Sequence, residues 1–145
     1  MTNEEYLELI KKLNILIDDE ILEKENLFVL ATKTTQVNDD MPHAPGVSDK
    51  VSKLSVKIAM KEEEIDHIID VLVDLRDEIK EQIRKLPADE CDVLYRYYVL
   101  NEGLFDIADS KHFSEGWIKK LKYRGVRKIQ VIKSAVYEEA CKLLY

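Results

Sequence analysis

A seven-residue apolar repeat over residues 51–86 constrains the fold of this chain more than any other feature. Its positions are Val51, Ile58, Ile65, Leu72, Ile79 and Leu86, with Leu54, Ile68 and Leu75 at the alternate positions. Apolar residues at this spacing lie along one face of an α-helix that packs against another helix. Lys61 and Gln82 interrupt the alternate positions, which argues against an unbroken parallel zipper. The repeat predicts a long coiled-coil-like helix over residues 50–86, ended by Pro87 because the residue before a proline disfavours helix.

A second amphipathic helix is predicted ahead of this one, over residues 1–36. Its apolar residues recur three or four positions apart, and they are Tyr6, Leu9, Ile10, Leu13, Leu16, Ile17, Ile21, Leu27, Phe28 and Ala31. Residues 37–49 contain Pro42, Pro45 and Gly46, which disfavour a continuous helix. We therefore predict a linker or hinge between the two helices.

The sequence allows two packing partners for the long helix. Residues 1–36 of the same chain would give a hairpin, and a second copy would give a coiled-coil homodimer. The repeat is roughly 54 Å long at 1.5 Å per residue, which is long for the core of one small domain. Apolar residues of the first helix also occupy more than one face. These two observations favour a homodimer formed through the N-terminal helices.

Composition supports an all-α fold, and the length fits either one domain or a small domain with an appendage. The 145 residues are 46% apolar and include only four glycines and three prolines. Cys91 and Cys141 have no metal-ligand spacing, so neither a metal site nor a disulfide framework is expected. No apolar run approaches the ~20 residues of a membrane span, and the acidic N-terminus resembles no signal peptide. We expect a cytoplasmic protein with no membrane partner.

Residues 87–145 have the pattern of a helix-turn-helix domain. An apolar helix comes first, and the residues on its inner side are Val93, Leu94, Tyr97 and Tyr98. Gly103 is predicted to close this helix in the left-handed conformation. A short helical segment follows over residues 104–109. Ser114 is then positioned to cap a third helix, where Glu115 complements the positive end of the helix dipole.

Charge is concentrated on this third helix. Residues 111–133 hold eight basic residues and one acidic residue, a net charge of +7, whereas residues 1–110 hold 13 basic and 26 acidic residues, a net charge of −13. Basic side chains clustered on one helix can neutralise DNA phosphates by releasing counterions. The segment therefore predicts a helix that enters the major groove of double-stranded DNA.

The same segment resembles region 4 of the bacterial sigma-70 factors, the module that reads the promoter −35 element. The resemblance covers about 45 residues, and its matching positions are Leu86-Pro87, Val93-Leu94, Arg96-Tyr97-Tyr98, Gly103-Leu104, Asp106-Ile107-Ala108, Ser114-Glu115, Trp117-Ile118, Leu121, Arg124 and Ile129. The run Ser-Glu-x-Trp-Ile-x-x-Leu-x-x-Arg is more similar still to the small sigma-like regulators of Gram-positive prophages, including late-gene activators of the ArpU and RinA type. Gly116, Lys122 and Gly125 depart from the usual pattern. The resemblance implies promoter recognition and RNA polymerase as a further partner.

Ten residues are predicted to contact DNA. They are Ser114, Glu115, Gly116, Lys119, Lys120, Lys122, Tyr123, Arg124, Arg127 and Lys128. The residues of the first turn and a half, which are Glu115, Gly116, Lys119 and Lys120, are placed to read bases. The residues better placed for phosphates are Lys122, Arg124, Arg127 and Lys128. Trp117 is predicted to be a core anchor beside Ile118. Among Tyr95, Tyr97 and Tyr98, two are predicted to pack inside and one to lie exposed.

Two functions from different classes fit these patterns. The favoured one is a sequence-specific transcription regulator, of phage or prophage derivation, that recognises promoters without melting them. The alternative is a helical interaction or assembly protein, such as a phage DNA-packaging subunit or a polymerase-binding adaptor. No phosphate loop, nucleophile motif or clustered His, Cys and carboxylate set is present, so neither an enzyme nor a cofactor is predicted.

Overall fold

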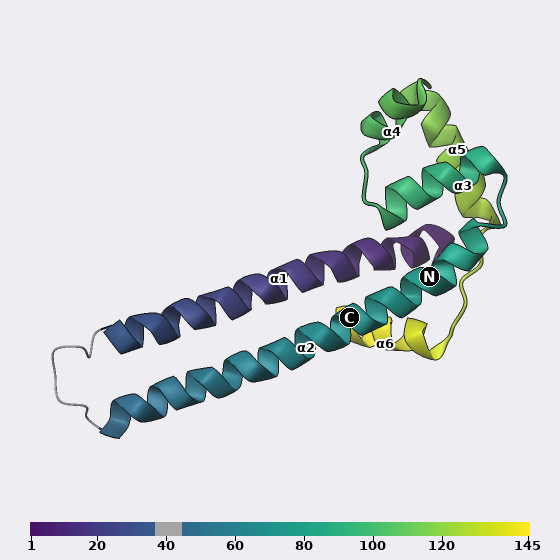
Figure 1. Ribbon diagram of the computed structural model, residues 1–145. Helices are drawn as coiled ribbons and strands as arrows, with labels where there is room; N and C mark the ends of the chain where they lie inside the picture. The colour runs from purple at the N-terminus through teal and green to yellow at the C-terminus, as the bar shows by residue number, and fades with distance from the viewer. Residues whose placement is uncertain (37–44) are drawn as a thin grey trace. The chain divides into compact units, whose positions relative to one another are not determined.

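The computed structural model describes residues 1–36 and 45–145, and every regular element in these residues is a helix (Figure 1). The elements are α1 (Asn3–Gln36), α2 (Pro45–Ile83), α3 (Ala88–Leu94), the π-helical turn η1 (Tyr95–Val99), α4 (Leu104–Lys111), α5 (Glu115–Lys128) and α6 (Ala135–Leu144). The predicted all-α class is confirmed. None of the helices in the described residues is both long and apolar enough to cross a membrane.

Helix α2 begins earlier than the repeat indicated. It starts at Pro45, inside the predicted linker 37–49, where the missing N–H of proline costs nothing because the first N–H groups of a helix have no partner within it. The rest of that linker, residues 37–44, lies outside the described residues. Helix α1 agrees with its predicted range.

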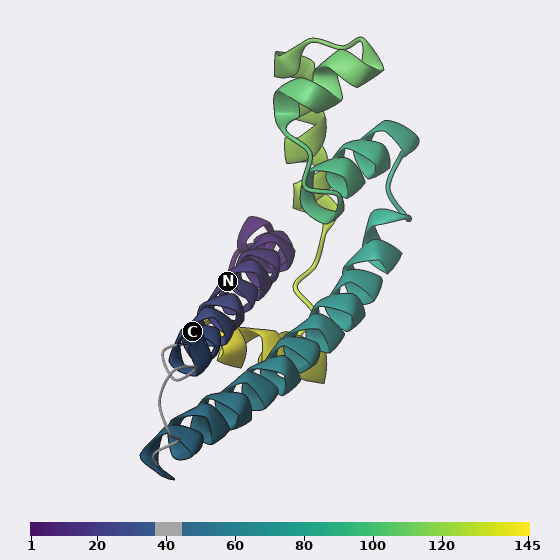
Figure 2. The same ribbon diagram turned by 60° about the vertical axis from the view of Figure 1, so that its left-hand side comes forward.

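The long helices pack as a hairpin, so α1 of the same chain covers the seven-residue repeat. The chain divides into two compact units, and each contains a segment of both helices. We call residues 1–14 and 71–145 the head unit, and residues 15–70 the arm unit. In both units the α1 and α2 segments lie side by side (Figures 1 and 2). Repeat positions Ile65, Leu72 and Ile79 are all buried.

The two polar interruptions of the repeat each make specific bonds. In the arm unit, the Lys61 ammonium lies 2.6 Å from a Glu20 carboxylate oxygen and 3.2 Å from one of Glu23, both on α1. The hydrogen bond to Glu20 holds the pKa of Lys61 above its usual range. In the head unit, the Gln82 side chain donates to the Gln130 carbonyl and accepts from its N–H, both at 2.9 Å. Lys61 therefore links α2 to α1, and Gln82 links α2 to the segment between α5 and α6.

Helix α6 packs on the long helices within the head unit. The Ser134 hydroxyl caps α6 by accepting from the Tyr137 N–H at 3.1 Å, and it donates to Glu78 of α2 at 2.8 Å. The rings of Tyr137 and Tyr6 lie 5.9 Å apart. The predicted domain 87–145 therefore includes a last helix that belongs to the packing of the long helices.

Helices α3, α4 and α5 surround a small core of their own in the head unit. Its fully or largely buried members are Val93, Ile107, Ala108, Ile118 and Leu121. Helix α4, the turn at residues 112–114 and α5 follow the predicted order. The Ser114 cap is confirmed, because its hydroxyl oxygen accepts from the Trp117 N–H at 3.2 Å.

The predicted role of Gly103 is wrong. Gly103 has a φ of −71° and an extended backbone, and it precedes α4 as its N-cap. The left-handed residue is Asn101, with a φ of 58°, and the next N–H, of Glu102, donates to the Arg96 carbonyl at 2.9 Å. Asparagine tolerates this conformation better than most residues because its short polar side chain can bond locally. The left-handed residue that closes the helix is therefore Asn101 and not Gly103.

Candidate nucleic-acid interface

One face of α5 is exposed and basic. Six of the ten predicted DNA contacts lie on it, and we call Gly116, Lys119, Lys120, Tyr123, Arg124 and Arg127 the basic face. Ile118, Leu121 and Gly125 are buried on the opposite side of the same helix. Gly116, Lys120, Tyr123 and Arg127 are spaced four, three and four residues apart, so they form one row about 16 Å long at 1.5 Å per residue.

Aromatic rings orient both arginines of the basic face. The Arg127 guanidinium carbon lies 5.6 Å from the centre of the Tyr123 ring, and that of Arg124 lies 5.3 Å from the Trp117 ring. A guanidinium held over a ring keeps its planar donor edge available for phosphate or base oxygens. The rings thus reduce the conformational freedom that these arginines would lose on binding.

Ser114 and Glu115 are exposed at the start of α5, ahead of the basic face. The Ser114 oxygen is engaged as the helix cap, as described above. Glu115 lies in the first turn, where a negative charge complements the helix dipole. Both positions remain accessible to a ligand that approaches the start of the helix.

Lys122 and Lys128, also predicted to contact DNA, are paired with acids of the same chain. The Lys122 ammonium lies 3.4 Å from Glu4 of α1 and 4.4 Å from the centre of the Tyr97 ring. The Lys128 ammonium lies 2.7 Å from the buried carboxylate of Glu90. In the free chain each of these two lysines therefore has a structural role as the partner of an acid.

Lys111 is a third basic residue of the segment 111–133 that pairs with an acid. It reaches across from α4 to Asp92 of α3, at 2.5 Å. Burial raises the pKa of Asp92, but the hydrogen bond and the positive charge of Lys111 lower it. The pKa of Asp92 is lowered overall. Lys119, Lys120, Arg124, Arg127 and Lys133 are exposed. Internal pairing therefore divides the basic residues into a structural group and an exposed group.

The two unusual glycines of α5 have opposite environments. A Cβ on Gly125 would lie 2.8 Å from the Cδ1 atom of Leu94, so α3 and α5 can approach this closely only with glycine there. A Cβ on Gly116 would meet nothing within 4 Å. The first glycine is explained by packing, whereas nothing within the described residues requires the second.

The aromatic side chains around this core differ in how deeply they are buried. Trp117 is half-buried and packs against the α3–α5 core, so it contributes to the core as predicted but does not fill its centre. Tyr98 is fully buried, while Tyr95 and Tyr97 are both half-buried. Tyr97 packs against the same core, so two of the three rings lie inside as predicted, whereas Tyr95 is half-buried and not exposed.

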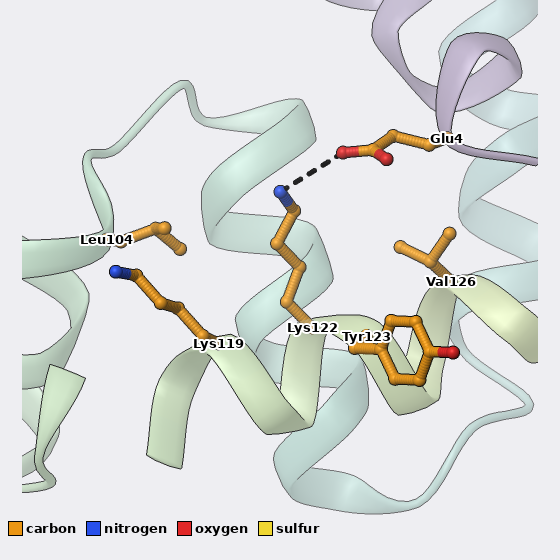
Figure 3. Close-up of a pocket in the computed structure, with 6 residues that line it drawn as sticks. All are labelled: Glu4, Leu104, Lys119, Lys122, Tyr123 and Val126. Carbon is orange, nitrogen blue, oxygen red and sulfur yellow. Dashed lines mark hydrogen bonds and ion pairs between the residues drawn. The ribbon is translucent and has the colours of Figure 1, made fainter. Parts of the chain in front are cut away.

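A pocket beside the basic face involves a residue that the sequence did not indicate. It has a volume of about 300 Å³ and is lined by Glu4, Leu104, Lys119, Lys122, Tyr123 and Val126 (Figure 3). Lys122 extends from α5 toward Glu4, whereas the ammonium of Lys119 ends beside Leu104. The side chain of Asn3 adds a bond from its amide to the Val126 carbonyl at 3.2 Å. The first turn of α1 is therefore attached to the flank of α5.

No known protein family, curated protein sequence or solved structure matches this chain. Within residues 1–36 and 45–145, no group of three or more His, Cys, Asp or Glu side chains is placed to hold a metal ion.

Proposed function

We propose that this protein is a sequence-specific transcription regulator that inserts α5 into the major groove of double-stranded DNA. The supporting observation is the separation of charge on and around α5. Lys120 and Arg127 are exposed in one row, while Lys111, Lys122 and Lys128 pair with acids of the chain. Because residues 1–110 carry a net charge of −13, this face is where an anionic polymer is least repelled.

The resemblance to region 4 of sigma factors supports a more specific version of the proposal. We propose promoter recognition without promoter melting, in the cytoplasm, for a regulator of prophage derivation with RNA polymerase as a second partner. The competing candidate is a helical assembly protein whose basic helix binds DNA without regard to sequence. Single base-pair changes distinguish the two, since a specific reader loses about 1–3 kcal/mol at each critical position and the assembly protein loses almost nothing.

The dependence of DNA affinity on salt tests the role of the basic face. Arg124→Ala and Arg127→Ala should each flatten the slope of log K against log[salt] by about 0.9, the amount expected for one lost phosphate contact. A residue that contacts a base should instead relax the preference for one base pair. Lys142→Ala, which removes an equal charge from an exposed position on α6, is the control and should leave the slope unchanged. Equal slopes for all three variants would contradict the assignment of this face.

We also propose that a second copy of the chain binds to the arm unit. Ile15, Leu22 and Val29 recur every seven residues on α1 and are 60%, 58% and 47% exposed. Leu22 lies two residues from both Glu20 and Lys24, which form ion pairs with α2, so it points away from α2. Monomeric proteins seldom expose an apolar strip of this kind.

Charge supports a second copy as the occupant. Asp18 and Glu25 lie among these apolar residues of α1, and Lys53 and Lys57 flank the exposed Val56 of α2. One copy can therefore place its α2 lysines against the α1 acids of another. The predicted homodimer thus uses the outer face of the hairpin instead of the repeat, whose partner is α1.

Sedimentation of charge-reversed variants tests this association. Glu25→Lys and Lys57→Glu should each sediment as monomers at a concentration where the wild type is a dimer, because each places like charges in the contact. An equimolar mixture of the two should recover the dimer. A monomeric wild type, or a mixture that stays monomeric, would contradict the proposal.

A further inference from the structure

We infer that Glu4 occupies the position of a DNA phosphate beside α5 and competes with DNA for Lys122. This inference rests on the proposed function and adds a residue of the N-terminal helix to the DNA site. Its ligand class is the phosphodiester group of a nucleic-acid backbone. The site is the pocket between the first turn of α1 and the flank of α5, which Figure 3 shows.

The geometry of the pair is that of a weak, replaceable contact. The carboxylate of Glu4 is 54% exposed and lies 3.4 Å from the Lys122 ammonium, whose side chain is only 18% exposed. Lys122 is held in place by its position above the Tyr97 ring, at 4.4 Å from the ring centre. The ammonium of Lys122 thus lies against the Tyr97 ring, whereas the side chain of Glu4 is more than half exposed to solvent. A phosphate can take the place of such a carboxylate without leaving a buried charge unpaired.

A second lysine makes the pocket more suited to phosphate than to a carboxylate. Lys119 lines the same pocket from one turn earlier on α5, and it belongs to the basic face. A phosphodiester group bound at Lys122 would have a second lysine in the lining of the same pocket, and Lys119 lies next to the row formed by Lys120 and Arg127 on α5. DNA on the basic face therefore brings a phosphate close to the place where Glu4 lies in the free protein.

The free chain should consequently bind DNA more weakly than its basic face alone would allow. When DNA binds, the Lys122–Glu4 pair must open, and the negative charge of Glu4 remains close to the incoming backbone. Both effects apply to every DNA sequence, because phosphate contacts carry no direct sequence information. Glu4 thus limits overall affinity and leaves base discrimination unchanged.

The test compares Glu4→Gln with Glu63→Gln, an equal charge change at an exposed position of the arm unit. Affinity for a random-sequence duplex at fixed salt should rise about two- to five-fold in Glu4→Gln, the change that corresponds to removing one exposed ion pair. Glu63→Gln should show less than half of that gain. Equal gains in the two variants would overturn the inference, since net charge would then explain them.

A second substitution shows whether the gain acts through Lys122. In a Lys122→Met background, which keeps an unbranched side chain over Tyr97, Glu4→Gln should give no gain beyond that of Glu63→Gln. A gain that persists without Lys122 would overturn the inference. A wild type that binds no duplex would overturn the proposed function and this inference together, whereas normal binding with an unresponsive Glu4→Gln would overturn the inference alone.

Discussion

Replacing Gly125 by alanine is expected to lower the free energy of unfolding by about 1–3 kcal/mol, the usual cost of adding a methyl group to a well-packed core. The new Cβ would lie 2.8 Å and 3.0 Å from the Cδ1 and Cγ atoms of Leu94. Leu94 is fully buried on α3, so it cannot move aside without disturbing its own neighbours. The backbones of α3 and α5 must therefore separate. Urea unfolding followed by circular dichroism measures the change.

Gly116→Ala is the matched control on the same helix. A Cβ at Gly116 meets nothing within 4 Å, so the substitution only removes the conformational freedom of glycine. It should raise the free energy of unfolding by about 0.5–1 kcal/mol. Changes of the same sign for the two glycines would show that the described crossing of α3 and α5 is incorrect.

Replacing Lys128 by methionine is expected to destabilise the head unit by about 1–3 kcal/mol. The substitution leaves the Glu90 carboxylate, only 7% exposed, without the ammonium that lies 2.7 Å from it. A buried charge that loses its partner costs more than the pair contributed. The expected cost stays below the 3–5 kcal/mol that is typical of fully buried pairs, because the Lys128 side chain is 50% exposed.

A second substitution separates this explanation from a general loss of packing. Glu90→Gln removes the buried charge, so the double variant Glu90→Gln, Lys128→Met should recover part of the lost stability. Lys120→Met, at an exposed position of the same helix, should change stability by less than about 0.5 kcal/mol. If Lys128→Met melts like the wild type, Lys128 has no structural role and becomes available again as a phosphate contact.

The sequence predicted correctly those features that depend on interactions between residues close together in the chain. The repeat at Ile65, Leu72 and Ile79 placed the buried face of α2 correctly, because helical periodicity needs no knowledge of the partner. Ser114 was identified as a cap because its bond spans only three residues. The turn after η1 was also located, but the left-handed residue in it was not, since Asn101 and Gly103 can both adopt that conformation.

The candidate site was predicted less well, because ion pairs join residues that are distant in the sequence. Nothing in the segment 111–133 indicates that Lys122 meets Glu4, 118 positions away, or that Lys128 meets Glu90, 38 positions away. The same limit applies to Lys61 and Gln82, whose polarity was recognised but whose partners were not. Lys120, Tyr123 and Arg127, which are all among the ten predicted contacts, nevertheless lie on one exposed face of α5.

Selection of duplexes from a random pool by the purified full-length chain tests the central claim most directly. If α5 reads bases, a consensus sequence should emerge, and at one salt concentration it should bind at least about a thousand-fold more tightly than a scrambled duplex of the same length. Single changes at its critical positions should each cost about 1–3 kcal/mol. Equal affinity for selected and scrambled duplexes would contradict a sequence-specific regulator.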